Sequence, residues 1–118
     1  MDRTALRDYC LSKKGAIAEF PFGPEAEVFK VAGKMFGLVP TDADPPTISL
    51  KCDPTLAEML RQTYAAVIPG YHLNKRHWNT VTVDGSIPDD EVLEMIDHSY
   101  ELVVRGLKKA DREKLERQ

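Results

Sequence analysis

The stretch that decides the fold is Val28-Phe29-Lys30-Val31-Ala32-Gly33-Lys34-Met35-Phe36-Gly37-Leu38-Val39. The β-branched and aromatic residues on both sides of Gly33-Lys34 favour strands. Gly33-Lys34 allows a tight reversal, so the stretch predicts an antiparallel β-hairpin. Downstream, residues 47–52 alternate polar and apolar side chains, which predicts a third strand with one face in water.

Helical patterns surround these strands. Residues 2–14 place apolar side chains on one stripe, and Gly15 follows where such a helix would end. Asp53-Pro54 predicts the start of a second helix, because Asp is favoured at the N-cap and Pro at the first helical position. The inner stripe of this second helix is expected to comprise Leu56, Met59, Leu60 and Tyr64.

The C-terminal third contains one more strand and one more long helix. Residues 78–83 predict a strand, and Asp84-Gly85 predicts the turn after it. Ser86 and Asp89 have the spacing of a capping box at the start of a third helix. Its apolar face extends from Val92 to Leu107, and residues 108–118 predict a short, charged and loosely packed helical tail.

The composition is typical of a single soluble domain spanning residues 1–118. Apolar residues make up 42% and charged residues 30% of the chain, and no apolar run has the length of a membrane span. The N-terminus does not read as a signal peptide. Cys10 and Cys52 are expected to be reduced and buried in a cytoplasmic protein. The order of elements indicates an α+β fold, a two-layer arrangement with a mainly antiparallel sheet and helices on one face.

The most unusual segment is Gly70-Tyr71-His72-Leu73-Asn74-Lys75-Arg76-His77-Trp78-Asn79-Thr80-Val81. The chain has a net charge of −3, yet residues 59–83 contain no Asp or Glu while they contain Arg61, Lys75 and Arg76. Cations contact phosphate, and aromatic rings stack on exposed bases. In the structural alternative, Tyr71 and Trp78 anchor the core and Lys75-Arg76 is a solvated tip.

Catalytic and metal patterns are weak. Cys52, next to Lys51 and a helix start, is the only credible nucleophile, although a structural cysteine at a strand end is the favoured interpretation. His72, His77 and His98 do not have the spacing of a metal site, and no cysteine pair has zinc spacing. No glycine-rich phosphate loop is present. We therefore expect no enzyme activity, no cofactor and no metal.

Much of the chain resembles the MmcQ/YjbR family of small bacterial proteins. The resemblance rests on six blocks: Phe20-Pro21-Phe22-Gly23-Pro24, Val28-Phe29-Lys30-Val31, Gly33-Lys34-Met35-Phe36, Ile48-Ser49-Leu50-Lys51-Cys52-Asp53-Pro54, Pro69-Gly70-Tyr71-His72-Leu73-Asn74-Lys75-Arg76-His77-Trp78-Asn79 and Asp97-His98-Ser99-Tyr100-Glu101-Leu102-Val103. It implies the order α-β(3)-α-β(2)-α, with an additional strand near residues 67–71. It also implies an architecture similar to type III secretion chaperones and frataxin-like proteins. Fold does not fix function.

The resemblance further implies DNA binding through two wing-like hairpins. The residues expected to contact DNA are His72, Asn74, Lys75, Arg76, His77 and Trp78, together with Lys30, Lys34 and Lys51. The alternative is a protein-interaction or chaperone-like module that holds a partner segment on a sheet face or edge, anchored by Phe20, Phe22 and Tyr71. A third hypothesis places a planar ligand between residues 21–24 and residues 71–78. No membrane partner is expected, and the sequence does not indicate an oligomeric state.

Overall fold

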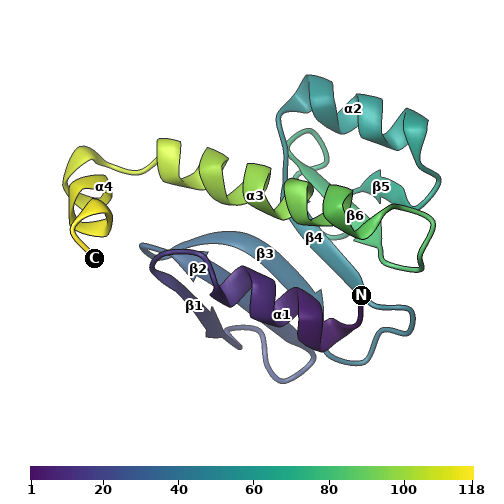
Figure 1. The fold of residues 1–118 in the computed structure, drawn as a ribbon, viewed down its shortest axis with the longest axis horizontal. Coiled ribbons are helices and arrows are strands. Elements are labelled where there is room, and N and C mark those ends of the chain that lie inside the picture. Colours follow the sequence, from purple (N-terminus) through teal and green to yellow (C-terminus); the bar gives the residue numbers. More distant parts are fainter.

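The computed structural model describes residues 1–118 as one six-stranded antiparallel sheet with four helices (Figure 1). The strand order across the sheet is β1-β2-β3-β4-β6-β5. The helices are α1 (Arg3–Leu11), α2 (Pro54–Thr63), α3 (Asp89–Arg105) and α4 (Lys109–Glu116). The strands are β1 (Ala16–Glu19), β2 (Ala26–Val31), β3 (Lys34–Pro40), β4 (Thr47–Lys51), β5 (Val67–Pro69) and β6 (Trp78–Thr82). The predicted α+β class and antiparallel sheet are confirmed. None of the helices has the length and apolar character needed to cross a membrane.

The strand register assigns residues to two faces, because successive side chains point to opposite sides of a sheet. The row that meets the helices comprises Ala18, Phe29, Gly37, Leu50, Asn79 and Pro69. A Cβ atom on Gly37 would lie 3.8 Å from the Cys10 sulfur of α1, and Asn79 donates to the Ala57 carbonyl of α2. We call the opposite side the open face; its matching row comprises Glu19, Val28, Leu38, Ser49, Thr80 and Ile68.

Helix α3 is hydrogen-bonded to the sheet at the point where β3 and β4 stop pairing with each other. The ladder between these strands covers only Gly37–Leu50 and Leu38–Ser49. Just beyond it, the fully buried hydroxyl of Ser99 donates to the Phe36 carbonyl at 2.6 Å and accepts from the Lys51 N–H at 2.9 Å. One hydroxyl therefore satisfies two backbone groups that would otherwise be buried without a partner.

Helix α1 is fixed at its N-terminal half by a buried carboxylate. Asp2 caps the helix by accepting from the Ala5 N–H at 2.8 Å. Glu27 of β2 is only 2% exposed and accepts from Arg3 at 3.1 Å and from Arg7 at 3.0 Å. Both arginines keep part of their surface in water, so the desolvation cost of this cluster is lower than that of a fully buried ion pair. It fixes α1 across the edge of the core.

Several sequence expectations were wrong in detail. The first helix ends at Leu11, and an additional strand, β1, follows it, so four strands precede α2. Strand β1 is only four residues long and half of it is alanine, which does not favour strands, so its residues give little indication of the pairing with β2. On α2, Met59 is 57% exposed and Ala57 is the buried residue.

The ends of the last two helices also differ from expectation. The capping box does not form: Pro88 is the N-cap of α3 without a side-chain bond, and Asp84 accepts instead from the Ser86 N–H and hydroxyl. The tail is helical, as predicted. However, Leu115 of α4 is buried, and its methyl group would lie 2.4 Å from a Cβ on Gly15. The tail therefore packs against the turn after α1 instead of standing loose.

The Glu27 cluster predicts a measurable loss of stability. Replacing both Arg3 and Arg7 by alanine leaves the buried Glu27 carboxylate without a cation, which we expect to lower the free energy of unfolding by roughly 3 kcal/mol. Urea denaturation measures this value. Adding Glu27→Gln to the double variant should restore part of the loss, and Arg105→Ala, on an exposed surface, should change little. Equal stability of the double variant and the wild type would show that the carboxylate does not need its partners.

Candidate functional site

The segment of residues 70–78, which we call the basic turn, connects β5 to β6 and is closed at its neck by backbone. The Gly70 N–H donates to the Trp78 carbonyl at 2.8 Å. A Cβ atom on Gly70 would lie 2.7 Å from the Trp78 Cβ and 3.0 Å from the Trp78 carbonyl oxygen, so the close approach requires glycine. The two ends of the basic turn are therefore held together independently of its side chains.

Arg61 of α2 fixes the basic turn from the helix side. Its Nε donates to the Asn79 side-chain oxygen at 2.7 Å. Its Nη2 donates to the Lys75 carbonyl and, at 3.3 Å, to the Trp78 carbonyl. A guanidinium has a planar fork of donors that suits several acceptors at once. The sequence analysis counted Arg61 with Lys75 and Arg76 in the positive charge of residues 59–83, whereas in the structure its guanidinium holds the turn.

The remaining polar side chains shape the tip. The Asn74 side chain accepts from the Arg76 N–H at 3.0 Å, which is the local bond expected of an asparagine in a turn. Lys75 and Arg76 are both exposed, and neither forms an ion pair. Lys75 donates to the Gly70 carbonyl at 3.1 Å, so its ammonium folds back over the neck. Arg76 borders a small pocket together with Thr55, Glu58 and Arg61 of α2.

The same turn carries two exposed rings. Tyr71 is 68% exposed, and its ring centroid lies 3.9 Å from that of His72 at an interplanar angle of 53°. The Tyr71 N–H donates to the Thr80 hydroxyl, which belongs to the open face. Trp78 and His77 are half-buried, so Trp78 is a partial anchor. The basic turn thus presents the Tyr71–His72 ring pair and the exposed cations Lys75 and Arg76.

Of the other predicted lysines, the structure brings two to this end of the sheet. Lys51 lies directly opposite Trp78 in the β4–β6 register, and Lys34 begins the neighbouring strand β3 at the same end. Lys30 also lies on the open face, but it forms an ion pair with Glu19 at 2.9 Å. Lys30 is therefore the member of the predicted set whose charge is already compensated.

The three anchors of the alternative hypothesis do not lie together. Phe20 and Phe22, 50% and 69% exposed, are in the connection between β1 and β2, next to the start of β2. The register places that end of β2 opposite the end of the sheet that holds Tyr71. The expected ligand pocket between residues 21–24 and 71–78 is consequently excluded by the same geometry.

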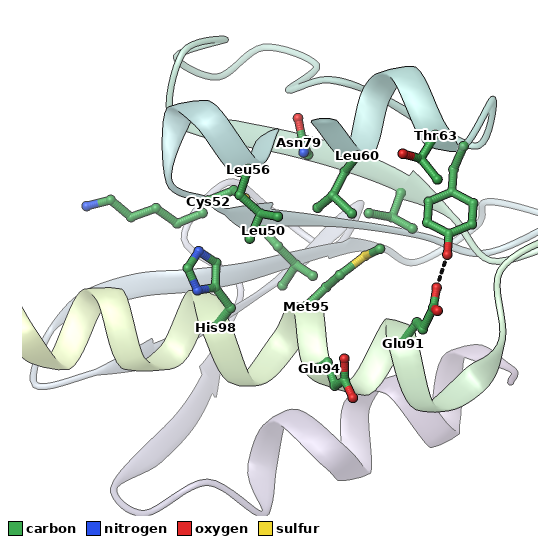
Figure 2. Close-up of a pocket in the computed structure, with 13 residues that line it drawn as sticks. Leu50, Cys52, Leu56, Leu60, Thr63, Asn79, Glu91, Glu94, Met95 and His98 are labelled. Carbon is green, nitrogen blue, oxygen red and sulfur yellow. Dashed lines mark hydrogen bonds between the residues drawn. The ribbon is translucent and has the colours of Figure 1, made fainter. Parts of the chain in front are cut away.

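A cavity that sequence reasoning missed lies between α2 and α3, above β4 and β6 (Figure 2). Its volume is about 440 Å³. Cys52, the candidate nucleophile, contributes to its wall, and burial together with the Asp53 carboxylate raises the pKa of this thiol to about 11. Burial raises the pKa of Cys10 to about 12. Neither cysteine is a thiolate at neutral pH, so the nucleophile hypothesis receives no support. No group of three or more His, Cys, Asp and Glu lies close enough to hold a metal ion.

Comparisons with known proteins all identify the same family. A family model described as YjbR matches residues 11–102. The chain is 39% identical over 115 residues to the "Uncharacterized protein YjbR" of Escherichia coli strain K12, covering 98% of both chains. It is 41% identical over 96 residues to the "Uncharacterized protein YbdF" of Escherichia coli O157:H7, covering 81% of this chain and 79% of the relative. The crystal structure of Deinococcus radiodurans protein DR2400, described as a DUF419 domain, superposes with a TM-score of 0.91 at 41% identity and covers 97% of this chain and 87% of that one.

The contacts of Arg61 predict that removing its guanidinium loosens the basic turn and lowers the stability of the protein. In Arg61→Met the Asn79 oxygen and the Lys75 carbonyl lose their donor, which should cost about 1–3 kcal/mol for the buried group. Urea denaturation measures the loss, and amide hydrogen exchange of residues 70–78 should accelerate. The neighbouring exposed residue offers a matched control, Gln62→Met. Unchanged exchange in the basic turn of Arg61→Met would contradict the assignment.

The raised pKa of Cys52 predicts slow alkylation at neutral pH. A shift from 9.0 to about 11 leaves roughly one hundredth of the usual thiolate fraction, and the rate should rise about tenfold per pH unit until pH 11. The pKa of Cys52 is higher in the folded state than in the unfolded state, so the protonated thiol favours folding. This contribution to stability is fully present below the unfolded pKa of 9.0 and is lost as the pH rises from there to about 11. Iodoacetamide labelling of Cys10→Ala, followed by mass spectrometry, isolates Cys52. The urea-unfolded protein is the control, and equally fast labelling of the folded protein at pH 7 would contradict the prediction.

Proposed function

The chain belongs to the YjbR family, and we propose that it binds DNA through the basic turn and the adjoining end of the open face. The observation that supports this proposal is that one turn exposes two cations, Lys75 and Arg76, together with the Tyr71–His72 ring pair. Cations attract phosphate, and exposed rings stack on bases. Because Gly70, Arg61 and Asn74 fix the turn before any ligand arrives, little conformational entropy is lost on binding.

The charge distribution around the basic turn agrees with this assignment although the chain is acidic overall. Residues 59–83 contain no acidic side chain, and Lys51 and Lys34 extend the positive surface along the same end of the sheet. The net charge of −3 instead disfavours contact with DNA over other parts of the surface. We therefore infer a small footprint with few phosphate contacts and moderate, strongly salt-dependent affinity.

The exposed rings favour single-stranded over duplex DNA. Bases within a duplex are already stacked on each other, whereas unpaired bases can stack on Tyr71 or His72. The turn is short and contains no helix that could enter a major groove. Sequence preference is expected to be weak, because stacking tolerates every base.

Charge reversal of the tip tests the proposal. Lys75→Glu combined with Arg76→Glu should weaken binding of a fluorescent single-stranded oligonucleotide by at least about tenfold. The slope of log K against log salt concentration should become shallower by about 1.4, because each lost phosphate contact removes about 0.7 from it. Fluorescence anisotropy at several salt concentrations measures both values. The melting temperature should stay close to that of the wild type, because both side chains are exposed.

The chain offers a matched control in Lys108→Glu with Lys109→Glu, which changes the net charge equally at the start of α4. This control should retain binding. Equal weakening by both double variants would assign the effect to net charge alone, and absence of oligonucleotide binding at low salt would disprove the proposed function.

One observation favours a second candidate, a protein partner at the edge of the sheet. Strand β1 is an edge strand without proline, Ile17 on it is 49% exposed, and the exposed Phe20 and Phe22 follow directly. The opposite edge, β5, is three residues long and ends in Pro69, which hinders strand addition. A partner strand would therefore pair with β1, and Phe20→Ser with Phe22→Ser would abolish that binding while leaving DNA binding intact.

A further inference from the structure

Two helices and two strands form the walls of the cavity between α2 and α3. Strands β4 and β6 form its floor, and Figure 2 shows Leu56 and Leu60 from α2 facing Met95 and His98 from α3. The centre is apolar, lined by Leu50, Leu56, Leu60, Val81 and Met95. A volume of about 440 Å³ lies within the range of small-molecule sites.

Polar contacts join the two helices at both ends of the cavity. At one end the hydroxyl of Tyr64, the C-cap residue of α2, donates to the Glu91 carboxylate of α3, as the dashed line in Figure 2 shows. At the other end His98 of α3 accepts from the Asp53 N–H, at the N-cap of α2, at 3.2 Å. The helices are thus held apart at a fixed spacing while the apolar space between them stays unfilled by side chains.

The dimensions restrict the class of occupant. A helix has a diameter of about 10 Å, so this volume would take only about one helical turn, too little for an amphipathic helix of a partner protein. Strand addition is excluded as well, because β4 and β6 pair with each other along the floor. A small molecule is the occupant that fits.

The charged groups around the cavity restrict its chemistry further. Glu91 and Glu94 of α3 both line it. Lys51 also contributes to the lining, but its position two residues after Ser49 directs its side chain toward the open face, opposite Leu50. Of the two carboxylates, Glu91 accepts from the Tyr64 hydroxyl, whereas Figure 2 shows the Glu94 carboxylate on the side of α3 away from Leu56 and Leu60. Glu91 is therefore the charged group that an occupant of the cavity would meet.

We propose that this cavity binds a small apolar amine, whose alkyl or aryl body lies between α2 and α3 and whose ammonium group contacts Glu91. The apolar body would displace water from the leucine and methionine side chains, which supplies most of the affinity. The ammonium would donate to the oxygens of Glu91 that the Tyr64 hydroxyl leaves free. This inference does not depend on the proposed DNA binding, because the cavity lies on the helix side of the sheet and uses none of the cations of the basic turn.

Three probes of similar size test the proposal: phenethylamine, hydrocinnamate and phenethyl alcohol. Two-dimensional amide NMR spectra of the full chain, recorded during titration with each probe, report binding. Phenethylamine should shift the signals of Leu60, Val81 and Met95 saturably, and hydrocinnamate should not. Glu91→Gln keeps an acceptor for Tyr64 but removes the charge, and it should weaken amine binding by about three- to fivefold. Asp90→Asn removes a neighbouring exposed charge outside the cavity and should have no effect.

A second pair of variants tests the position of the apolar body. Leu60→Trp fills the cavity and should abolish saturable binding, while Met59→Trp adds the same ring on the exposed side of α2 and should not. Absence of saturable binding by all three probes, or binding that Leu60→Trp leaves unchanged, would disprove the site. Equal or tighter binding of hydrocinnamate or phenethyl alcohol would disprove the amine assignment.

Discussion

The hydrogen bonds of the Arg61 guanidinium connect three parts of the molecule that no continuous element joins. They link α2 to the buried amide of Asn79 in β6 and to two carbonyls of the basic turn. Asn79 is only 2% exposed, and a buried amide needs such partners because it has lost its water. This side chain therefore contributes to the conformation of the turn, whose neck is also closed by the Gly70–Trp78 backbone bond, and to the position of α2, which forms one wall of the cavity.

Strand β6 separates two surfaces of different chemistry. Trp78 and Thr80 point to the open face, beside the exposed rings and cations, whereas Asn79 and Val81 point to the helices and line the cavity. The alternation of side chains along a strand produces this separation directly. The positive surface and the acidic lining on α3 are thereby kept on opposite sides of the sheet, which lets an acidic chain present both.

Local sequence predicted the features that depend on neighbouring residues. The hairpin around Gly33, the capped start of α2 at Asp53-Pro54 and the turn at Gly85 are confirmed, because turn and cap preferences act over a few residues. The Asn74 bond in the basic turn belongs to the same class. The blocks of the MmcQ/YjbR resemblance identified the family, and the comparisons confirm it over residues 11–102.

The sequence by itself therefore determined the α+β class, the family and the location of an exposed basic and aromatic turn. Tertiary structure alone decided the existence of β1, the exposure of Met59, the distance of Phe20 and Phe22 from Tyr71, and the cavity between α2 and α3. It also decided that Arg61 holds the turn and that Lys30 is paired with Glu19. These features arise from contacts between different segments of the chain, and the side-chain pattern within one segment contains no information about the partner that another segment will provide.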